Sequence, residues 1–153
     1  MDIGTGSGCL GITAKLEHPE LEVTLLDVSS DALRVAKKNA ELLSADVSIQ
    51  KSNLLIDYAY TPDIILANLP YVDESWERSK ETRHEPAIAL FASDTGLRLV
   101  KKCFDQLSNR TNTGAVAIFE ADPRQWDAIE TIAQESGFRL DEKQRFVASF
   151  IKV

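Results

Sequence analysis

The sequence has little cysteine and few basic residues, and each shortage excludes a class of protein. Its two cysteines, Cys9 and Cys103, are too few for a disulfide framework or a thiolate metal site. No apolar run approaches the ~20 residues that a membrane-spanning helix requires, and no signal-peptide pattern opens the sequence. Acidic residues outnumber basic ones by 24 to 17, for a net charge of −7. This balance argues against a duplex nucleic-acid binder, which needs a basic face.

What remains describes an ordinary globular chain. It has 153 residues, of which 44% are hydrophobic and 27% are charged. A chain of this size can bury roughly 70% of its extended-chain surface, so a real core is possible. We therefore expect a single domain spanning residues 1–153, in the cytoplasm, without a metal site and without membrane attachment.

Glycine is concentrated at one place. Four of the seven glycines lie between positions 4 and 11. Glycine is favoured where the backbone turns sharply or approaches a ligand closely. The start of the sequence is therefore the first candidate for a binding site.

Strand-like and helix-like segments alternate along the chain. Helices are expected at 7–17, from an N-cap at 29–31 to 43, at 95–109 and at 122–136; strands are expected at 22–28, 47–50, 63–67 and 115–120, and two antiparallel strands within 138–153. Residues 68–94 have no clear period and are expected to form a long loop with some helix. The alternation predicts an α/β fold with a mostly parallel sheet, helices on both faces and an antiparallel C-terminal strand.

The helical spacing also predicts which side chains face the core. The expected inward positions are Cys9, Leu10, Ile12 and Leu16 in the first helix, Leu33, Ala36, Ala40 and Leu43 in the second, Leu97, Val100, Phe104 and Leu107 in the third, and Trp126 with Ile129 in the last. Both cysteines are expected to be packing residues.

The glycine-rich segment Met1-Asp-Ile-Gly-Thr-Gly-Ser-Gly8 suits a strand that turns into a helix while its amides approach a charged group. Asp27 follows at the end of the next strand, where a carboxylate accepts hydrogen bonds from ribose hydroxyls. The segment resembles the first motif of Rossmann-like methyltransferases that use S-adenosylmethionine. It also fits Gly6-x-Gly8-x-x-Gly11, a dinucleotide fingerprint, so a nicotinamide cofactor stays open at this point.

A second motif, Asn68-Leu69-Pro70-Tyr71, follows the strand at 63–67. It resembles the Asn-Pro-Pro-Tyr motif of methyltransferases that act on planar nitrogen, with leucine in place of the first proline. An amide nitrogen is a poor nucleophile, and two acceptors on its hydrogens would orient it. The Asn68 side chain and the Leu69 carbonyl are expected to be those acceptors, and Tyr71 is expected to stack on the flat group. Pro70 restricts Leu69 to an extended conformation, which aims its carbonyl.

The two motifs together favour S-adenosylmethionine as the cofactor. The resemblance implies the following donor-binding residues: Asp2, Gly4, Thr5, Gly6, Gly8, Asp27, Val28, Asn53 and Asn68. It implies Asn68, Leu69, Pro70 and Tyr71 as the catalytic set. Asn53 matches the position that lies near the adenine in this class.

The segment from His84 to Leu97 carries a more restricted signature, with Glu85-Pro86, Ala89-Leu90 and Gly96-Leu97 in order. It resembles the protein-glutamine N-methyltransferases that modify peptide-chain release factors, a resemblance that extends from residue 1 to about 140. This family implies methylation of a glutamine amide in a release factor, and so a protein partner in translation termination. Glu85 is expected to border the donor pocket or to order its loop.

Two alternatives remain from the sequence. Enzymes that methylate adenine or guanine amino groups in nucleic acid share the Asn-Pro-Pro-Tyr motif, although the acidic balance disfavours them. An inactive binding module is the other, because the first motif begins at Asp2 and leaves the central strand largely missing. The family's N-terminal substrate-docking domain has no counterpart here, so we expect a truncated chain.

Overall fold

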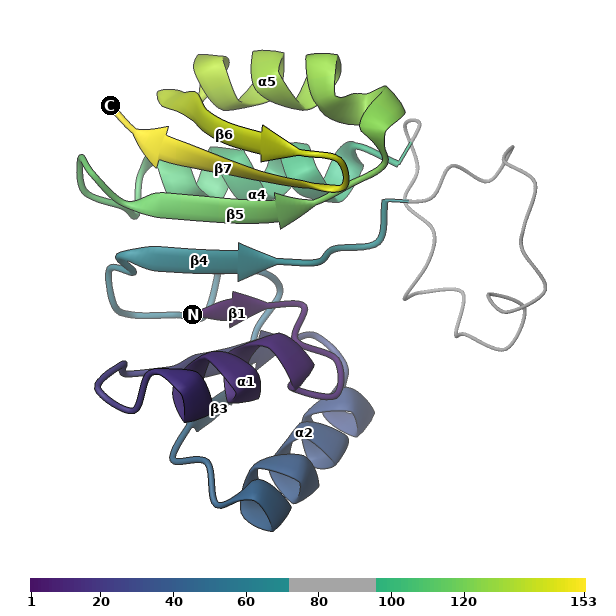
Figure 1. Ribbon diagram of the computed structural model, residues 1–153, viewed down its shortest axis with the longest axis vertical. Coiled ribbons are helices and arrows are strands. Elements are labelled where there is room, and N and C mark those ends of the chain that lie inside the picture. The colour runs from purple at the N-terminus through teal and green to yellow at the C-terminus, as the bar shows by residue number, and fades with distance from the viewer. Residues whose placement is uncertain (72–95) are drawn as a thin grey trace, which may run out of the picture.

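The computed structural model describes residues 1–71 and 96–153, and in this part of the chain seven strands form one sheet (Figure 1). The strands are β1 (Asp2–Ile3), β2 (Thr24–Asp27), β3 (Ser48–Lys51), β4 (Ile64–Ala67), β5 (Val116–Glu120), β6 (Phe138–Gln144) and β7 (Val147–Lys152). The helices are α1 (Cys9–Glu17), α2 (Ser30–Leu43), α4 (Arg98–Ser108) and α5 (Trp126–Glu135), and a 3₁₀ turn, η2 (Pro123–Gln125), leads into α5.

The sheet has the order β3-β2-β1-β4-β5-β7-β6. The first five strands pair in parallel, whereas β7 is antiparallel to both of its neighbours. Figure 1 shows α1 in front of the sheet and α4 behind it. The predicted fold class, a mostly parallel α/β sheet with an antiparallel C-terminal strand, is confirmed.

The central strand β1 is only two residues long, as the position of the first motif predicted. It pairs with β2 on one side and β4 on the other, with Asp2 opposite both Leu25 and Leu66. The order of strands therefore reverses around β1. In open parallel sheets, ligands bind at the carboxyl ends of the strands at such a reversal, so the fold itself points to the loops after β1 and β4.

Two apolar clusters hold the helices on the sheet. In the larger one, the Phe104 ring of α4 stacks on Phe119 of β5, with centroids 4.6 Å apart, and meets Phe138 and Phe150 edge-on at 5.4 Å each. Edge and offset contacts of this kind are the favoured geometries of aromatic pairs. The smaller cluster joins α1 and α2 to β2. The predicted inward positions of α4 and α5, including Trp126 and Ile129, are confirmed, although Leu97 is only partly buried.

The predicted inward faces of α1 and α2 are partly wrong. Ile12 is buried, but Leu10 and Leu16 are 44% and 43% exposed, Cys9 is exposed, and Leu43 of α2 is 55% exposed. The reason lies at Gly11: a Cβ there would lie 2.2 Å from the Leu25 side chain. The helix therefore packs closest to the sheet at Gly11. In α2, only Ala36 and Ala40 are buried, because small side chains let this helix approach the sheet.

The two thiols are expected to differ in reactivity. Cys103 is fully buried, and burial raises its pKa to about 12, so its thiolate is scarce at neutral pH. Cys9 is exposed at the start of α1. An aromatic disulfide reagent should therefore titrate one thiol in the folded protein and two in denaturant. Rapid labelling of both thiols without denaturant would contradict the buried position of Cys103, and Cys9→Ser should abolish the native-state signal.

Candidate functional site

The loop after β1 is built on three glycines with left-handed backbone conformations. Gly4, Gly6 and Gly8 have φ values of 67°, 56° and 84°, which residues with a side chain rarely adopt. The loop is tied to the sheet because the Thr5 backbone N–H donates to the Leu26 carbonyl at 2.9 Å. At Gly6, a Cβ would meet nothing within 4 Å. Glycine is therefore required here for the backbone conformation and not for lack of space. The open side of the loop leaves room for a ligand.

Asp2 lies under this loop. Its side chain is 2% exposed, and its Oδ2 accepts hydrogen bonds from the Thr5 hydroxyl at 2.5 Å and from the Gly11 backbone N–H at 2.9 Å. The carboxylate thus joins the loop to the first turn of α1. The predicted contact between Asp2 and a donor stays a prediction, but its position shows a second role, which is to fix the loop.

Asp27 holds the same loop from the neighbouring strand. Its Oδ2 accepts a hydrogen bond from the Gly6 backbone N–H at 2.9 Å, and its Oδ1 accepts one from the Ser29 N–H at 2.7 Å. The carboxylate ends β2 beside the glycine loop, as the spacing predicted. Val28, which follows it, is 50% exposed and presents an apolar surface at this edge. A carboxylate next to an exposed apolar side chain suits a nucleoside, which has polar ribose hydroxyls and a flat base.

The Asn68–Tyr71 segment leaves β4, the strand on the other side of β1. Asn68 is exposed, whereas the Leu69 side chain is 3% exposed within the larger apolar cluster. A Cβ on Gly4 would lie 3.0 Å from Leu69 Cδ2, so the two predicted motifs are in contact. Leucine therefore anchors this segment by burial at the position where the resembled motif has proline.

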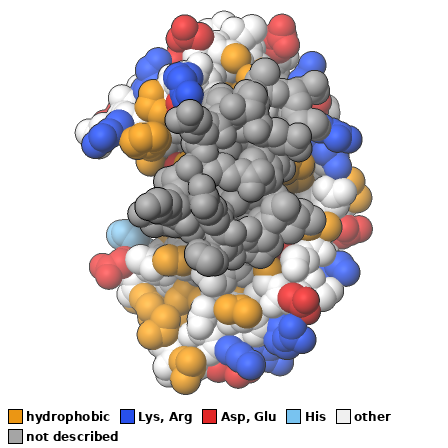
Figure 2. All heavy atoms as spheres, turned by 90° about the vertical axis from the view of Figure 1, so that its right-hand side faces the viewer, with side chains coloured by type: hydrophobic (Ala, Val, Ile, Leu, Met, Phe, Trp, Pro, Cys, Tyr) orange, Lys and Arg blue, Asp and Glu red, His pale blue; other side chains and the backbone are white. Residues whose placement is uncertain are grey.

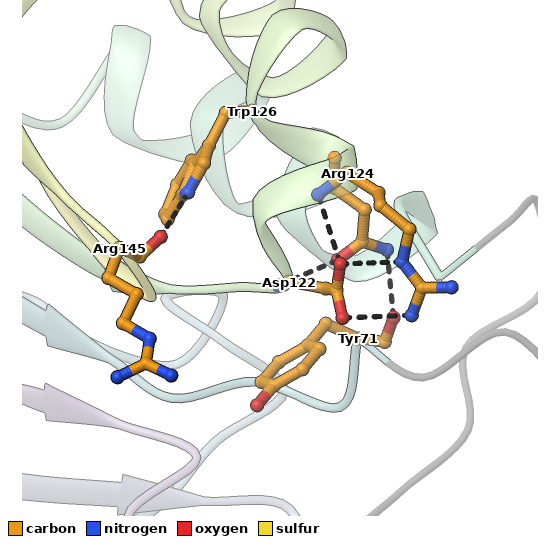
Figure 3. Close-up of polar contacts among 6 residues, drawn as sticks. Tyr71, Asp122, Arg124, Trp126 and Arg145 are labelled. Carbon is orange, nitrogen blue, oxygen red and sulfur yellow. Dashed lines mark hydrogen bonds and ion pairs between the residues drawn. The ribbon is translucent and has the colours of Figure 1, made fainter.

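Tyr71 is held by two residues that the sequence did not single out for the site. Its hydroxyl donates to Glu120 Oε1 at 3.0 Å. Its carbonyl accepts a hydrogen bond from Gln125 Nε2 at 2.8 Å (Figure 3). Glu120 ends β5, and Gln125 ends the η2 turn. A sequence signal that could have found Gln125 is its spacing from Asp122, because an N-cap residue followed three positions later by glutamine is the pattern of the capping box that these two residues form.

Two further predicted residues are Asn53 and Glu85. Asn53 follows β3, is exposed, and accepts a hydrogen bond from Lys102 Nζ at 3.1 Å. Glu85 and the rest of the signature from 84 to 95 lie outside the described residues, and only Gly96 and Leu97 of it are described. Figure 2 views the molecule from the side at which β1 and β4 end. Both acidic and basic side chains lie along the rim of this face.

The carboxyl edge of the sheet thus brings together the glycine loop, the Asp27 carboxylate and the Asn68–Tyr71 segment. This fold and site define a Rossmann-like methyltransferase domain, a class whose methyl donor is S-adenosylmethionine. The sequence model of the methyltransferase small domain family matches residues 1–110. The chain belongs to that family.

The similar proteins are also methyltransferases. The chain is 32% identical over 141 residues to a release factor glutamine methyltransferase of Bacillus cereus, covering 88% of the chain and 50% of that protein. For the release factor glutamine methyltransferase of Lactococcus lactis, the identity is 34%, with 88% and 51% covered. The ribosomal protein L11 methylase structure from Lactobacillus delbrueckii superposes with a TM-score of 0.75, at 26% identity, over 99% of this chain and 68% of that one.

The chain spans about half the length of the curated relatives it matches. Within residues 1–71 and 96–153, no helix combines the length and the apolar character needed to cross a bilayer.

The buried Asp2 carboxylate gives a pH-dependent prediction. Burial raises its pKa above the ordinary 3.8, so the ionised form destabilises the fold as pH rises through the folded-state pKa, and this cost is absent below 3.8. Asp2→Asn keeps an oxygen for Thr5 and Gly11 and removes the charge. Its stability relative to the unmodified chain should therefore improve from about pH 3.5 to pH 7.

Urea denaturation at both pH values measures this difference. Asp31→Asn is the matched control, because Asp31 is an exposed carboxylate in the first turn of α2. A relative stability of Asp2→Asn that is the same at both pH values would show that burial does not govern the ionisation of this carboxyl.

Proposed function

We propose that this protein transfers a methyl group from S-adenosylmethionine to the side-chain amide nitrogen of a glutamine in a protein, and that the acceptor is a peptide-chain release factor. In this reaction the bond from sulfur to the methyl carbon breaks, a nitrogen–carbon bond forms, and the amide nitrogen gives up one proton to solvent. The donor is consumed as its demethylated thioether.

The observation that carries the proposal is the contact between the two motifs. The glycine loop follows β1, the Asn68–Tyr71 segment follows β4, and Leu69 packs beneath Gly4. A donor on the loop and an acceptor at Asn68 would then meet at the same edge of the sheet. This arrangement supports transfer by proximity, in which two bound groups react at a high effective concentration.

The donor side fits the chain's own groups. The glycine backbone of the loop and the start of α1 offer N–H donors to the carboxylate of the methionine part. The Asp27 carboxylate offers acceptors to the ribose hydroxyls, and exposed Val28 offers an apolar contact to the base.

On the acceptor side, Asn68 Oδ1 and the Leu69 carbonyl would accept the two N–H groups of the glutamine amide. Two such acceptors orient the nitrogen toward the donor methyl and weaken the conjugation of its lone pair with the carbonyl. The Tyr71 ring would stack on the amide plane. These roles follow the Asn-x-Pro-Tyr resemblance together with the position of this segment after β4.

The acceptor class is supported by the names of the similar proteins. The relatives from Bacillus cereus and Lactococcus lactis are release factor glutamine methyltransferases, and the structure at 26% identity is a methylase of a ribosomal protein. All three act on proteins of translation. Because translation takes place in the cytoplasm, a cytoplasmic location of this protein is part of the proposal.

The test is direct. The chain is incubated with methyl-labelled donor and a purified release factor, and the product is analysed by peptide mass spectrometry. One methyl group on a single glutamine of the release factor is expected, and a release factor with alanine at that glutamine should stay unlabelled. Label in RNA in place of the release factor would overturn the acceptor, and donor binding with no transfer to either would favour a binding module.

A further inference from the structure

We propose that Glu120 and Gln125 are positioning residues that hold Tyr71 from both ends, its hydroxyl and its carbonyl, and so set the tilt of the ring against the acceptor amide. The role of the ring rests on the proposed function. The two contacts on Tyr71 do not, because they are properties of the folded chain.

The hydroxyl end is held by strand β5. Ala67, the last residue of β4, lies opposite Phe119, so Glu120 lies one position farther toward the carboxyl edge. From there its Oε1 accepts the Tyr71 O–H at 3.0 Å. A hydroxyl bonded to a carboxylate is a strong, directional contact, and it fixes the direction in which the ring points.

The carbonyl end is held by the turn before α5. Gln125 is 4% exposed, and its amide is used at both atoms. Its Nε2 donates to the Tyr71 carbonyl at 2.8 Å, and its Oε1 accepts a hydrogen bond from the Asp122 backbone N–H at 3.2 Å. A buried amide with both ends bonded cannot turn without leaving a polar group unsatisfied, so its position is well defined.

Gly96 makes this contact possible. Its φ is +81°, and a Cβ there would lie 2.0 Å from the Tyr71 carbonyl oxygen and 2.6 Å from Gln125 Nε2. The backbone before α4 therefore runs directly against the junction between Tyr71 and Gln125. Figure 3 shows the Tyr71 carbonyl turned toward this turn, where Arg124 and Asp122 also meet.

Glu120 and Gln125 come from a different part of the chain than the segment that they contact. Tyr71 lies within residues 1–110, which match the family model, whereas Glu120 and Gln125 lie beyond them. The Asn68–Tyr71 segment is thus completed by the end of β5 and the start of α5. Since a small misplacement of a reacting group is costly in rate, residues that fix the ring should affect kcat more than donor binding.

Two variants test the two ends. Gln125→Glu keeps the shape and an acceptor for Asp122 but turns the donor facing Tyr71 into an acceptor. Gln134→Glu, at an exposed position of α5, is the matched control for the added charge. Glu120→Ala removes the acceptor for the hydroxyl, and Glu120→Gln restores one. Circular dichroism and thermal melts check that each variant is folded.

We expect Gln125→Glu and Glu120→Ala to lower kcat about tenfold or more, with the Kd of S-adenosylmethionine changed less than about threefold. Glu120→Gln should recover most of the rate, and Gln134→Glu should match the unmodified chain. In a Tyr71→Phe background, Glu120→Ala should have no further effect, because the hydroxyl it would hold is gone.

A second readout needs no activity. With fluorotyrosine at the three tyrosines, the ¹⁹F signal of Tyr71, assigned by Tyr71→Phe, should move in Glu120→Ala and Gln125→Glu but not in Gln134→Glu. If the signals move as expected while the unmodified chain transfers no methyl group, the contacts stand and the proposed function fails. If the unmodified chain is active and kcat is unchanged in both variants, the positioning role is overturned. An unmoved signal in both overturns the contacts themselves.

Discussion

Replacing Asn68 with alanine is expected to lower kcat for glutamine methylation by about 10²–10³-fold, the range seen when one preorganised polar group is removed from a reacting centre. Asn68 is the exposed first residue after β4 and supplies one of the two acceptors proposed for the amide hydrogens. Without it, the nitrogen keeps its conjugation and is no longer aimed at the donor methyl. The release factor would still bind over the rest of its surface, so the loss should fall on kcat more than on KM.

The measurement is single-turnover methyl transfer with a saturating release factor, together with calorimetric titration of the donor. Because Asn68 is also expected to border the donor, the Kd of S-adenosylmethionine should rise in the variant. The fold-change in this Kd should be smaller than the fold-change in the transfer rate. Asn112→Ala is the matched control: it removes an exposed asparagine in the turn that precedes β5, at the opposite edge of the sheet. A rate within about threefold of the unmodified chain would remove Asn68 from the catalytic set.

Most of the sheet could be predicted from the sequence because the strands after β1 carry their own signals. The runs before Asp27 and Asn68 are apolar and end in polar residues, and Asp122-Pro123 announces the start of a helix. The inward face of α1 could not be predicted in the same way. A pattern of large apolar residues favoured Leu10 and Leu16, but the closest contact to the sheet is made by Gly11, whose value lies in the side chain that it lacks.

In the candidate site, too, local motifs could be recognised from the sequence and contacts between distant residues could not. The glycine loop, Asp27 and the Asn68–Tyr71 segment are local motifs, so their resemblance to known motifs could be seen in the sequence without the fold. Glu120 and Gln125 contact Tyr71 across 49 and 54 residues, and no local pattern encodes a contact of that separation. Asp2 was located by its motif, but its use as a support under the loop depends on Gly11, which only the fold brings close to it.

Replacing Asp27 with alanine is expected to raise the Kd of S-adenosylmethionine by roughly 30–100-fold, which corresponds to about 2–3 kcal/mol of lost charge-assisted hydrogen bonding. Two effects add. The ribose hydroxyls lose their acceptor, and the Gly6 and Ser29 backbone N–H groups lose theirs, so the glycine loop is less well held. Calorimetry measures the change, with Asp31→Ala on α2 as the matched loss of an exposed carboxylate. An affinity within about threefold of the unmodified chain would show that Asp27 does not serve the donor.

The two effects can be separated with a modified ligand. The demethylated product and its 2′-deoxyribose analogue are titrated against the unmodified chain and against Asp27→Ala. If Asp27 contacts the ribose, the unmodified chain should prefer the ribose form and the variant should lose that preference, because the missing hydroxyl then has no partner to lose. If Asp27 only holds Gly6, both proteins should discriminate equally, and the weaker binding by the variant should be the same for both ligands. The first outcome assigns the carboxylate to the nucleoside, and the second to the loop.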